Sequence, residues 1–398
     1  FYYKTFMWPK SFWYRIYEPF IRKAAGFGVA SIKHDNERYE HKYEYCDLLI
    51  TGSGPSGLAS AYSAAKNGAR VILAEDKPRF GGSLLTSEAN IGNQNGKEWA
   101  DKIVAELKEM PNVIVKNRAQ VFGYYDHNML VMSERINDHL PKSKKYSPKQ
   151  RLWYIRAKEV VISSGSIERP IVFGNNDTPG VVLASAAKEY LKVYGVLVGK
   201  KPLIFTNNDS AYETAIEFKK NGIWPIVLDT RSNPDSEIIN EAKSMGIDIR
   251  FSHVVIAAKG YKKVKSAEIA KISEDKKDLG KIENVSCDCI CVSGFWTPTI
   301  HLASQSGNKT KFNETIDAFV PGVPKQNEKT LGSANGIFTL EETLKTSFEY
   351  GEEVSKKITK KENKISVPQV SEKKHTQHDK FWCVSLPKGK TYKRFLDF

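Results

Sequence analysis

The stretch that decides the fold is "LLITGSGPSGLASAYSAAKNGARVILAED", residues 48–76. An apolar run leads into the turn Gly52-Ser53-Gly54-Pro55-Ser56-Gly57, a helix pattern of small residues follows, and a second apolar run ends at Glu75. The G-x-G-x-x-G turn is informative because it stands between a strand and a helix. Its first glycine permits a tight turn, its second lets a pyrophosphate approach the backbone, and its third lets the helix pack closely on the strand. The stretch predicts a dinucleotide-binding β-α-β unit.

A carboxylate at the end of the second strand indicates which dinucleotide is bound. Glu75 follows Gly57 by eighteen residues. A carboxylate at this position accepts hydrogen bonds from ribose hydroxyls and repels a 2′-phosphate, which favours NAD or FAD over NADP. The phosphates would lie on the backbone N–H groups at the start of the helix. For Lys77 and Arg79, which come next, we expect pairing with Asp76 or Glu75.

Strand and helix signals alternate in two separate series. The first covers residues 46–125, a stretch rich in strand signals follows at 119–160, and a second series begins near residue 202. Such alternation predicts parallel sheets. The chain is therefore expected to be an α/β protein of the flavoprotein class with two dinucleotide-binding (Rossmann-like) domains, one nested in the other. The expected divisions are an aromatic and basic packing segment at 1–45, a dinucleotide-binding domain at 46–172 and 285–357, a nested Rossmann-like domain at 173–284, and a mobile linker with the start of a following domain at 358–398.

The second series opens on "LIFTNNDSAYETAIEF", residues 203–218, whose turn contains no glycine. Asparagine tolerates left-handed backbone, so the turn itself can form. Its side chains would, however, occupy the space that a pyrophosphate needs. Asp209 is expected to act as an N-cap carboxylate in the place of the phosphate. We therefore predict one dinucleotide per chain, bound at Gly52–Gly57.

Composition excludes several function classes. The chain has 398 residues, 60 Lys and Arg, 46 Asp and Glu, and a net charge of +14. These charges are scattered and no nucleic-acid-binding module is present, so we expect surface charge or docking to acidic partner subunits, and no nucleic acid. No apolar run approaches the roughly 20 residues of a membrane helix, and no secretory signal is visible, which predicts a cytoplasmic protein. The missing initiator Met and the strand-like ending indicate a piece of a longer polypeptide.

Cysteine and histidine offer little catalytic chemistry. The five cysteines form no C-x-x-C pair, so no redox dithiol and no metal site are expected. Cys287, Cys289 and Cys291 are expected on one face of a strand, buried and too spread out to hold one ion. His301 is expected to be a packing residue or, alternatively, to line a flavin interface. The remaining two histidines of interest, His375 and His378, fall in the linker and are predicted to be inert.

Several longer stretches carry a family resemblance. They are "FYYKTFMWP" (1–9), "GSIERPIVF" (165–173), "NNDTPGVVLASA" (175–186), "SGFWTPTIHLASQSG" (293–307) and "LPKGKTYKRFLDF" (386–398). Together with the glycine turn and "FTNNDSAY" they resemble, in order and over essentially the whole chain, the alpha subunit of heterotetrameric sarcosine oxidase. In that family a ferredoxin-like domain precedes the first stretch and an aminomethyltransferase-like folate domain follows the last. The resemblance implies that both are absent here.

The resemblance also implies a reaction and partners. These enzymes demethylate sarcosine to glycine, yielding hydrogen peroxide and either formaldehyde or methylenetetrahydrofolate. Amine oxidation takes place at FAD on the beta subunit, FMN lies at the alpha–beta interface, and gamma and delta subunits complete the complex. The alpha subunit carries NAD, so NAD is the expected cofactor of this chain, with FAD as the alternative. Because no dithiol is present, electrons must leave through a partner flavin, or the dinucleotide is not redox-active; we favour the second.

The expected cofactor site combines the fingerprint with loops that the resemblance maps onto it. Residues 163–165 read Ser-Ser-Gly where related folds more often have Ala-Thr-Gly, and the hydroxyl is kept. "GSANG" (332–336) precedes a helix whose N-terminus would point at the dinucleotide. No catalytic residue is predicted. Two alternatives are a reductase-type FAD/NADH oxidoreductase and the alpha subunit of an opine or proline dehydrogenase complex. The expected cofactor-binding residues are Gly52, Ser53, Gly54, Pro55, Ser56, Gly57, Glu75, Asp76, Lys77, Gly81, Gly82, Ser83, Gln120, Val121, Ser163, Ser164, Gly165, Gly294 and Gly336.

Overall fold

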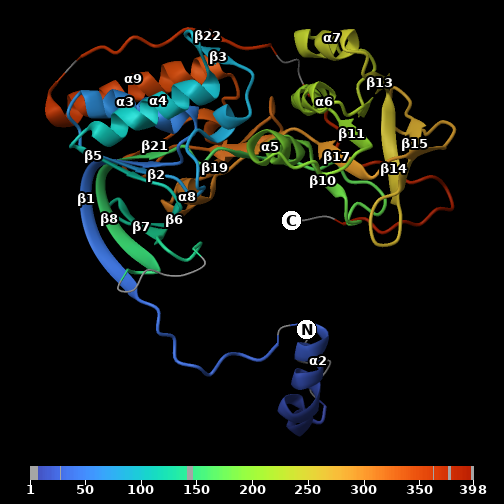
Figure 1. Ribbon diagram of the computed structural model, residues 1–398, viewed down its shortest axis with the longest axis horizontal. Helices are drawn as coiled ribbons and strands as arrows, with labels where there is room; N and C mark the ends of the chain where they lie inside the picture. Colours follow the sequence, from blue (N-terminus) through green and yellow to red (C-terminus); the bar gives the residue numbers. More distant parts are fainter. Residues whose placement is uncertain (1–7, 27, 141–146, 362, 375–377, 396–398) are drawn as a thin grey trace.

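The computed structural model describes residues 8–26, 28–140, 147–361, 363–374 and 378–395. Its first domain is built on a mixed sheet in the order β5-β2-β1-β8-β7-β6, with β21 also paired to β8 (Figure 1). Strands β5, β2, β1, β8 and β21 are parallel, and β7 and β6 are antiparallel. The strands are β1 (Tyr39–Thr51), β2 (Val71–Ala74), β5 (Val113–Lys116), β6 (Ala119–Tyr125), β7 (Met129–Arg135), β8 (Gln150–Ile162) and β21 (Glu328–Thr330).

Three helices cover one face of the first sheet: α3 (Pro55–Lys66), α4 (Gly96–Glu109) and α9 (Leu340–Thr359). Helices α3 and α9 approach so closely that a Cβ at Gly351 would lie 2.7 Å from the carbonyl oxygen of Ser60. Small residues on both helices permit this contact. The short elements of this domain are η3 (Gly82–Leu85), β3 (Asn90–Ile91), β4 (Gln94–Asn95), β9 (Ser166–Glu168), β18 (Trp296–Pro298), α8 (His301–Gln305), β19 (Thr310–Asn313), β20 (Ala318–Pro321) and η4 (Gly332–Asn335).

The second domain has its own parallel sheet, in the order β10-β17-β11-β12-β13. The nested Rossmann-like arrangement expected from the sequence is thus present. Strand β17 lies inside this sheet, between β10 and β11, whereas the expected boundary at 285 assigns it to the first domain. The chain therefore returns to the first domain only after Ser293. The elements are β10 (Val181–Leu183), α5 (Ala184–Tyr194), β11 (Pro202–Thr206), α6 (Ser210–Lys220), β12 (Ile226–Asp229), α7 (Glu237–Ser244), β13 (Asp248–Phe251) and β17 (Cys289–Ser293), with an antiparallel sheet of β14 (His253–Lys259), β15 (Ser266–Lys271) and β16 (Glu283–Ser286).

The three clustered cysteines are buried, as predicted, but they do not share one face. Cys289 and Cys291 pack in the core under α5 and α6, whereas Cys287 packs on the opposite side of the sheet with Ile290. The reason is that β17 begins only at Cys289, and the chain bends at Asp288, whose carboxylate accepts hydrogen bonds from the backbone of residues 200 and 201. The expectation of a single face was therefore wrong.

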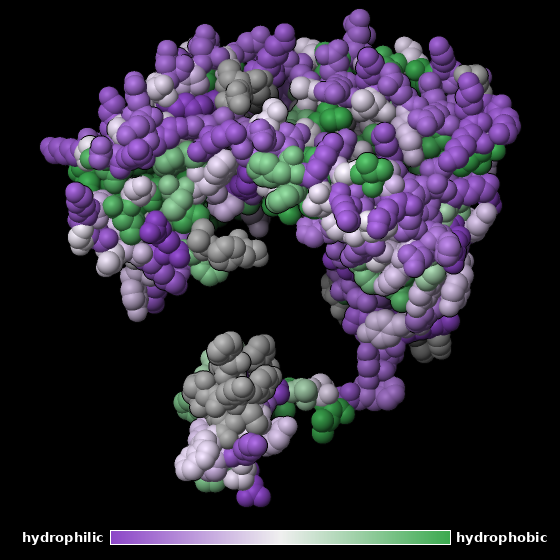
Figure 2. All heavy atoms as spheres, turned by 180° about the vertical axis from the view of Figure 1, so that it is seen from behind, coloured by the Kyte–Doolittle hydropathy of each residue, from purple (hydrophilic) through white to green (hydrophobic). Residues whose placement is uncertain are grey.

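The N-terminal segment is helical and stands apart from the two domains (Figure 1). It consists of η1 (Lys10–Phe12), the π-helical turn η2 (Trp13–Tyr17) and α2 (Glu18–Ala24), which end before Gly26. None of these residues is buried, and Trp8 is 85% exposed. Packing on its own domain, one of the two expected roles, is thus not seen for Lys10–Ala24, whereas residues 39–45 of the same expected segment pair with β8. Docking on a partner stays a prediction. Figure 2 shows the same separation from behind, where hydrophilic side chains cover most of the two domains.

The chain after α9 forms what we call the strap, residues 363–374 and 378–384. It runs over the helices of the first domain and crosses to the second domain (Figure 1). Strand β22 (Val370–Ser371) pairs with β3, and Phe381 and Val384 are buried in the second domain. We expected a mobile linker over these residues. In the structure they lie on both domains, because the apolar residues spaced among the lysines pack there.

Candidate dinucleotide-binding site

A cavity of about 2340 Å³ is lined by residues of both domains, at the carboxyl ends of β1, β2 and β8 and beside the strap. This is the edge of a parallel sheet where dinucleotides bind. Among the expected cofactor residues, Gly57, Gly81 and Gly294 do not line it. Those that do are Gly52, Ser53, Gly54, Pro55, Ser56, Glu75, Asp76, Lys77, Gly82, Ser83, Gln120, Val121, Ser163, Ser164, Gly165 and Gly336.

Each glycine of the fingerprint has a different structural role. Gly52 has a φ of +98°, and a Cβ there would overlap the carbonyl oxygen of Ser163. A Cβ on Gly57 would overlap the carbonyl oxygen of Gly52, so this residue sets the contact between helix and turn without facing the cavity. A Cβ on Gly54 would meet nothing within 4 Å. The space in front of Gly54 is therefore open, as a pyrophosphate at the N-terminus of α3 requires.

Glu75 is buried and braces the turn. Its carboxylate accepts hydrogen bonds from the backbone N–H of Ser53 at 2.9 Å, from the Ser53 hydroxyl at 2.6 Å and from the backbone N–H of Lys77 at 2.9 Å. Burial, with the neighbouring Asp76, raises the pKa of Glu75. The side chain of Lys77 pairs with Glu189 of α5 at 2.9 Å, which corrects the expected pairing with Asp76 or Glu75 and links the two domains.

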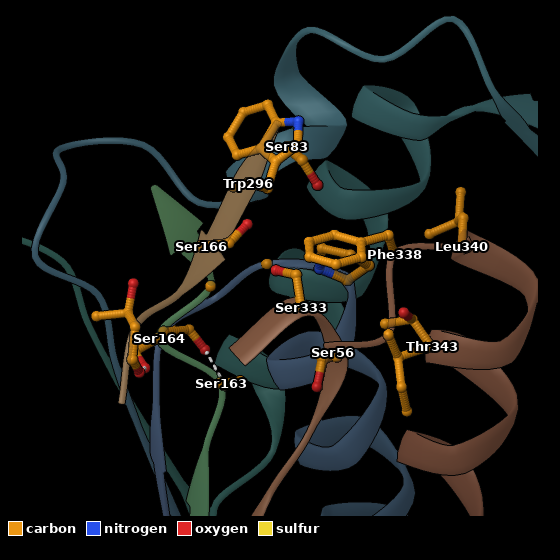
Figure 3. Close-up of a pocket in the computed structure, with 18 of the residues that line it drawn as sticks. Ser56, Ser83, Ser163, Ser164, Ser166, Trp296, Ser333, Phe338, Leu340 and Thr343 are labelled. Carbon is orange, nitrogen blue, oxygen red and sulfur yellow. Dashed lines mark hydrogen bonds between the residues drawn. The ribbon is translucent and has the colours of Figure 1, made fainter. Parts of the chain in front are cut away.

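Two further loops lie against the glycine turn. A Cβ on Gly82 would lie 2.8 Å from the Cα of Gly54, so the loop at 81–85 lies directly over the fingerprint. Gly81 donates its N–H to the carbonyl oxygen of Ser53 at 3.0 Å. At the end of β8, the Ser163 hydroxyl donates to the carbonyl oxygens of Thr51 and Gly52 at 2.9 and 3.0 Å (Figure 3). These contacts fix the turn before any ligand is present.

Gly294 lies behind the cavity wall. Its N–H donates to the carbonyl oxygen of Arg169 at 2.6 Å, and a Cβ would lie 3.0 Å from the carbonyl oxygens of Arg169 and Pro170. The glycine is required because two chain segments cross here between the domains. Gly294 was expected to contact the cofactor, but in the structure it permits a close contact between two backbone segments instead.

The N-terminus of α9 opens into the same cavity as that of α3. Figure 3 shows Ser56 of α3 and Ser333, Leu340 and Thr343 around this space. Gly332 has a φ of +63°, and a Cβ there would lie 3.0 Å from the Cβ of Ser56. The first-turn N–H groups of Leu340 and Glu341 donate to the carboxylate of Glu372 of the strap at 3.0 and 3.1 Å. Sequence reasoning missed Glu372, because nothing in a polar stretch shows where it folds back.

Aromatic side chains line the cavity beside the start of α9, where Figure 3 shows Phe338 next to Leu340. Phe295 has a φ of +76°, a conformation that is strained for a bulky residue. The ring of His378 stacks on it with centroids 4.1 Å apart, and Phe338 meets it edge-on at 5.2 Å. His378 also hydrogen-bonds Asp317 at 3.2 Å, and burial lowers its pKa despite that carboxylate.

Two of the three histidines singled out from the sequence lie among the described residues, and both differ from the first expectation. His378 is 6% exposed and lines the cavity, so its assignment as an inert linker residue was wrong. The apolar residues that follow it at 381–384 were the available signal. His301 is exposed at the first turn of α8 and lines the cavity, so it is no packing residue. His375 lies outside the described residues.

The glycine-free turn of the second domain is filled by side chains. Asn207 donates to the carbonyl oxygens of Asp379 and Phe381 of the strap at 2.8 and 3.2 Å. Asp209 stands at the N-cap position of α6, as predicted, but its side chain makes no capping hydrogen bond. The side-chain oxygen of Asn208 accepts from the backbone N–H of Ser210 at 3.0 Å instead, and the buried carboxylate of Asp209 pairs with Arg231 at 2.8 Å.

Within the ranges that the structure describes, no helix combines the length and the apolar character needed to cross a bilayer. In the same residues, no three His, Cys, Asp or Glu side chains lie together as ligands for a metal ion.

The fold and the cavity define the class: a two-domain FAD/NAD-binding fold of the flavoprotein oxidoreductases. The family model "FAD dependent oxidoreductase" matches residues 47–129. Thioredoxin reductase of T. acidophilum superposes with a TM-score of 0.60 at 14% identity, covering 79% of this chain and 98% of the other. L-proline dehydrogenase from P. horikoshii superposes with a TM-score of 0.58 at 20% identity, covering 83% and 58%. These structural likenesses show the fold alone.

Sequence comparison narrows the class: this chain is homologous to part of the alpha subunit of sarcosine oxidase. It is 39% identical to that subunit of Rhizobium meliloti (strain 1021) over 341 residues, which are 84% of this chain and 33% of the relative. The corresponding protein of Corynebacterium sp. (strain P-1) is 35% identical, covering 82% and 34%. An opine oxidase subunit from Agrobacterium tumefaciens (strain Ach5) is 28% identical, covering 48% and 38%. The chain thus spans about a third of the length of the sarcosine oxidase subunits that it matches.

Proposed function

We propose that this chain is the dinucleotide-binding part of the alpha subunit of a sarcosine oxidase and that it holds one NAD in the cavity at Gly52–Gly57. The observation that carries the proposal is the open phosphate position at Gly54. This position lies between the N-terminus of α3 and the loop at Gly82, and Glu75 directly follows the neighbouring strand β2. In the proposed complex, FAD on the beta subunit oxidises sarcosine, FMN lies at the alpha–beta interface, and gamma and delta subunits complete a cytoplasmic heterotetramer.

The chain's own residues bind and orient the ligand. The N–H groups at the start of α3 would hold the pyrophosphate, because the first turn of a helix has unpaired donors and a positive dipole end. Glu75 would accept hydrogen bonds from the adenosine ribose, which disfavours a 2′-phosphate. The loop at 81–85 and the strap would shield the ligand from water. NAD, when bound, supplies hydride-transfer chemistry in principle.

We further propose that the bound NAD has a structural role. No C-x-x-C pair occurs in the sequence, and none of the described residues that line the cavity is a cysteine. A reductase-type route from the dinucleotide to a disulfide therefore lacks its acceptor in this chain. Hydrogen peroxide and the one-carbon product, formaldehyde or methylenetetrahydrofolate, would arise on other parts of the complex.

The experiment that tests the proposal is identification of the nucleotide. Denaturing the purified protein should release one NAD per chain, recognised by mass and by its absorbance near 260 nm without a flavin band. Release of FAD from this chain together with NADH oxidation would select a reductase-type oxidoreductase instead. The 28% identity with the opine oxidase subunit keeps an opine or proline dehydrogenase complex as the second candidate. Oxidation of an opine or proline, but not of sarcosine, by the co-purified complex would favour it.

A further inference from the structure

The strap places a carboxylate at the N-terminus of a helix that opens into the cavity. Glu372 accepts hydrogen bonds from the N–H groups of Leu340 and Glu341, at 3.0 and 3.1 Å, and itself lines the cavity. Those two N–H groups would otherwise be free to hold an electronegative ligand group. The chain therefore provides its own anion here, and the positive end of the α9 dipole is neutralised.

The position along the ligand follows from the rest of the site and rests on the proposed function. Glu75 fixes the adenosine end, and the start of α3 fixes the pyrophosphate. Several other helix starts line the cavity, and among them the start of α9 lies beside the strap; in the proposed arrangement the second nucleoside extends toward it. The aromatic group of Phe295, Phe338 and His378 lies at this end and offers ring faces and edges for stacking.

We propose that Glu372 determines which ring the site accepts: it favours the oxidised, positively charged nicotinamide over the neutral reduced ring and over a flavin. A carboxylate attracts a cationic ring, whereas the reduced anionic form of a flavin would be repelled. Lys345 and Lys374 also line the cavity, but both are exposed, so solvent screens their charges. Lys373 is paired with Glu241. Glu372 is half-buried and held by two hydrogen bonds, so its charge is fixed in place.

The test compares the affinity for NAD⁺ and NADH in the purified complex after removal of its nucleotide. NADH is titrated by its fluorescence and NAD⁺ by competition. The wild-type protein should bind NAD⁺ more tightly than NADH. Glu372→Gln, which keeps a neutral acceptor for the helix, should weaken NAD⁺ binding about five- to tenfold and leave NADH nearly unchanged, as expected for a charge at a helix terminus. Glu372→Asp should keep the preference.

A matched control is Glu349→Gln, which removes a carboxylate from an exposed position two turns further along α9. It should change neither affinity. Equal weakening of both nucleotides by Glu372→Gln, or no change in either, overturns the role of Glu372 while leaving NAD binding established. Failure of the wild-type protein to bind either form instead overturns the proposed function.

Discussion

The two β-α turns of this molecule both connect a parallel strand to a helix, but only the first leaves space for a ligand. In the first domain, β1 runs through Gly52–Gly57 into α3, and the space in front of Gly54 is open. In the second domain, β11 runs through Asn207–Asp209 into α6, and the three side chains are buried and bonded within the chain. The cap of α6, the ion pair of Asp209 and the strap take up the groups that a phosphate would meet.

The difference shows that a Rossmann-like strand, turn and helix need an anionic partner at the helix start, but that the partner need not be a cofactor. Glycine leaves the N–H groups and the space to a ligand. In the second turn, the asparagine and aspartate side chains fill this space and form their bonds within the chain, so the domain keeps its fold without a nucleotide. The prediction of one dinucleotide per chain rests on this contrast, and four substitutions test it.

The largest effect is expected for Gly57→Ala. Its Cβ would overlap the backbone carbonyl oxygen of Gly52, which cannot move without breaking the turn. Overpacking against backbone should lower the free energy of unfolding by more than about 3 kcal/mol. Thermal unfolding followed by circular dichroism checks this. A variant with native stability would show that the close contact is not required.

In the second turn, Arg231→Met should be nearly as severe. Arg231 donates to Asp229 at 2.7 Å and to Asp209 at 2.8 Å, and both carboxylates are buried. Removing the guanidinium leaves two buried negative charges, which costs about 3–5 kcal/mol of unfolding free energy. The nucleotide content should stay at the wild-type level, measured after denaturation. Arg250→Met is the control, because its pair with Asp248 is on the surface and should contribute about 0–1 kcal/mol.

Gly54→Ala separates ligand binding from folding. The added Cβ meets nothing within 4 Å of the protein, and φ at this residue is −66°, so the fold should be kept. The methyl group would occupy the place of the pyrophosphate and weaken nucleotide binding by at least about tenfold, or about 1.4 kcal/mol. Isothermal titration calorimetry and thermal unfolding of the same sample check both halves. Unchanged affinity would argue against a phosphate at this turn.

The smallest effect is expected from pH. Burial, with Asp76, raises the pKa of Glu75, so this carboxylate takes up a proton at a higher pH than an ordinary glutamate. The ionised form is the better acceptor for ribose hydroxyls and for Ser53, and nucleotide binding should therefore weaken as the pH falls through the raised pKa. Affinity should be several-fold lower near about pH 5 than near about pH 8, and Glu75→Gln should flatten the profile. An equally steep profile in that variant would assign the effect to another group.

Sequence reasoning predicted the first turn well because its signals are local. Strand, glycines, helix and Glu75 lie within 29 residues, and their spacing follows from backbone geometry alone. The nested second domain was also predicted, since strand and helix alternation is local as well. The choice of NAD over FAD came from the family resemblance, because both ligands share the adenosine and pyrophosphate groups that the fingerprint contacts.

What could not be predicted depends on contacts between distant parts of the chain. Glu372 and His378 lie in a polar stretch whose composition resembles a linker, and the pairing of β22 with β3 and the packing of Phe381 and Val384 hold that stretch on the domains. Asp209 was assigned from its position before a helix, whereas its partner Arg231 is 22 residues away. Cys287 left the expected face because Asp288 bends the chain.

The order of synthesis gives the strap a further consequence. The glycine turn is translated at residues 52–57, and the part of the cavity wall formed by Glu372 and His378 comes more than 300 residues later. At ordinary translation rates this interval is on the order of 15–65 s. During this time the glycine turn is already made while one side of its cavity does not yet exist. A nucleotide can thus enter a nascent chain from the open side, before the strap emerges from the ribosome and folds over it.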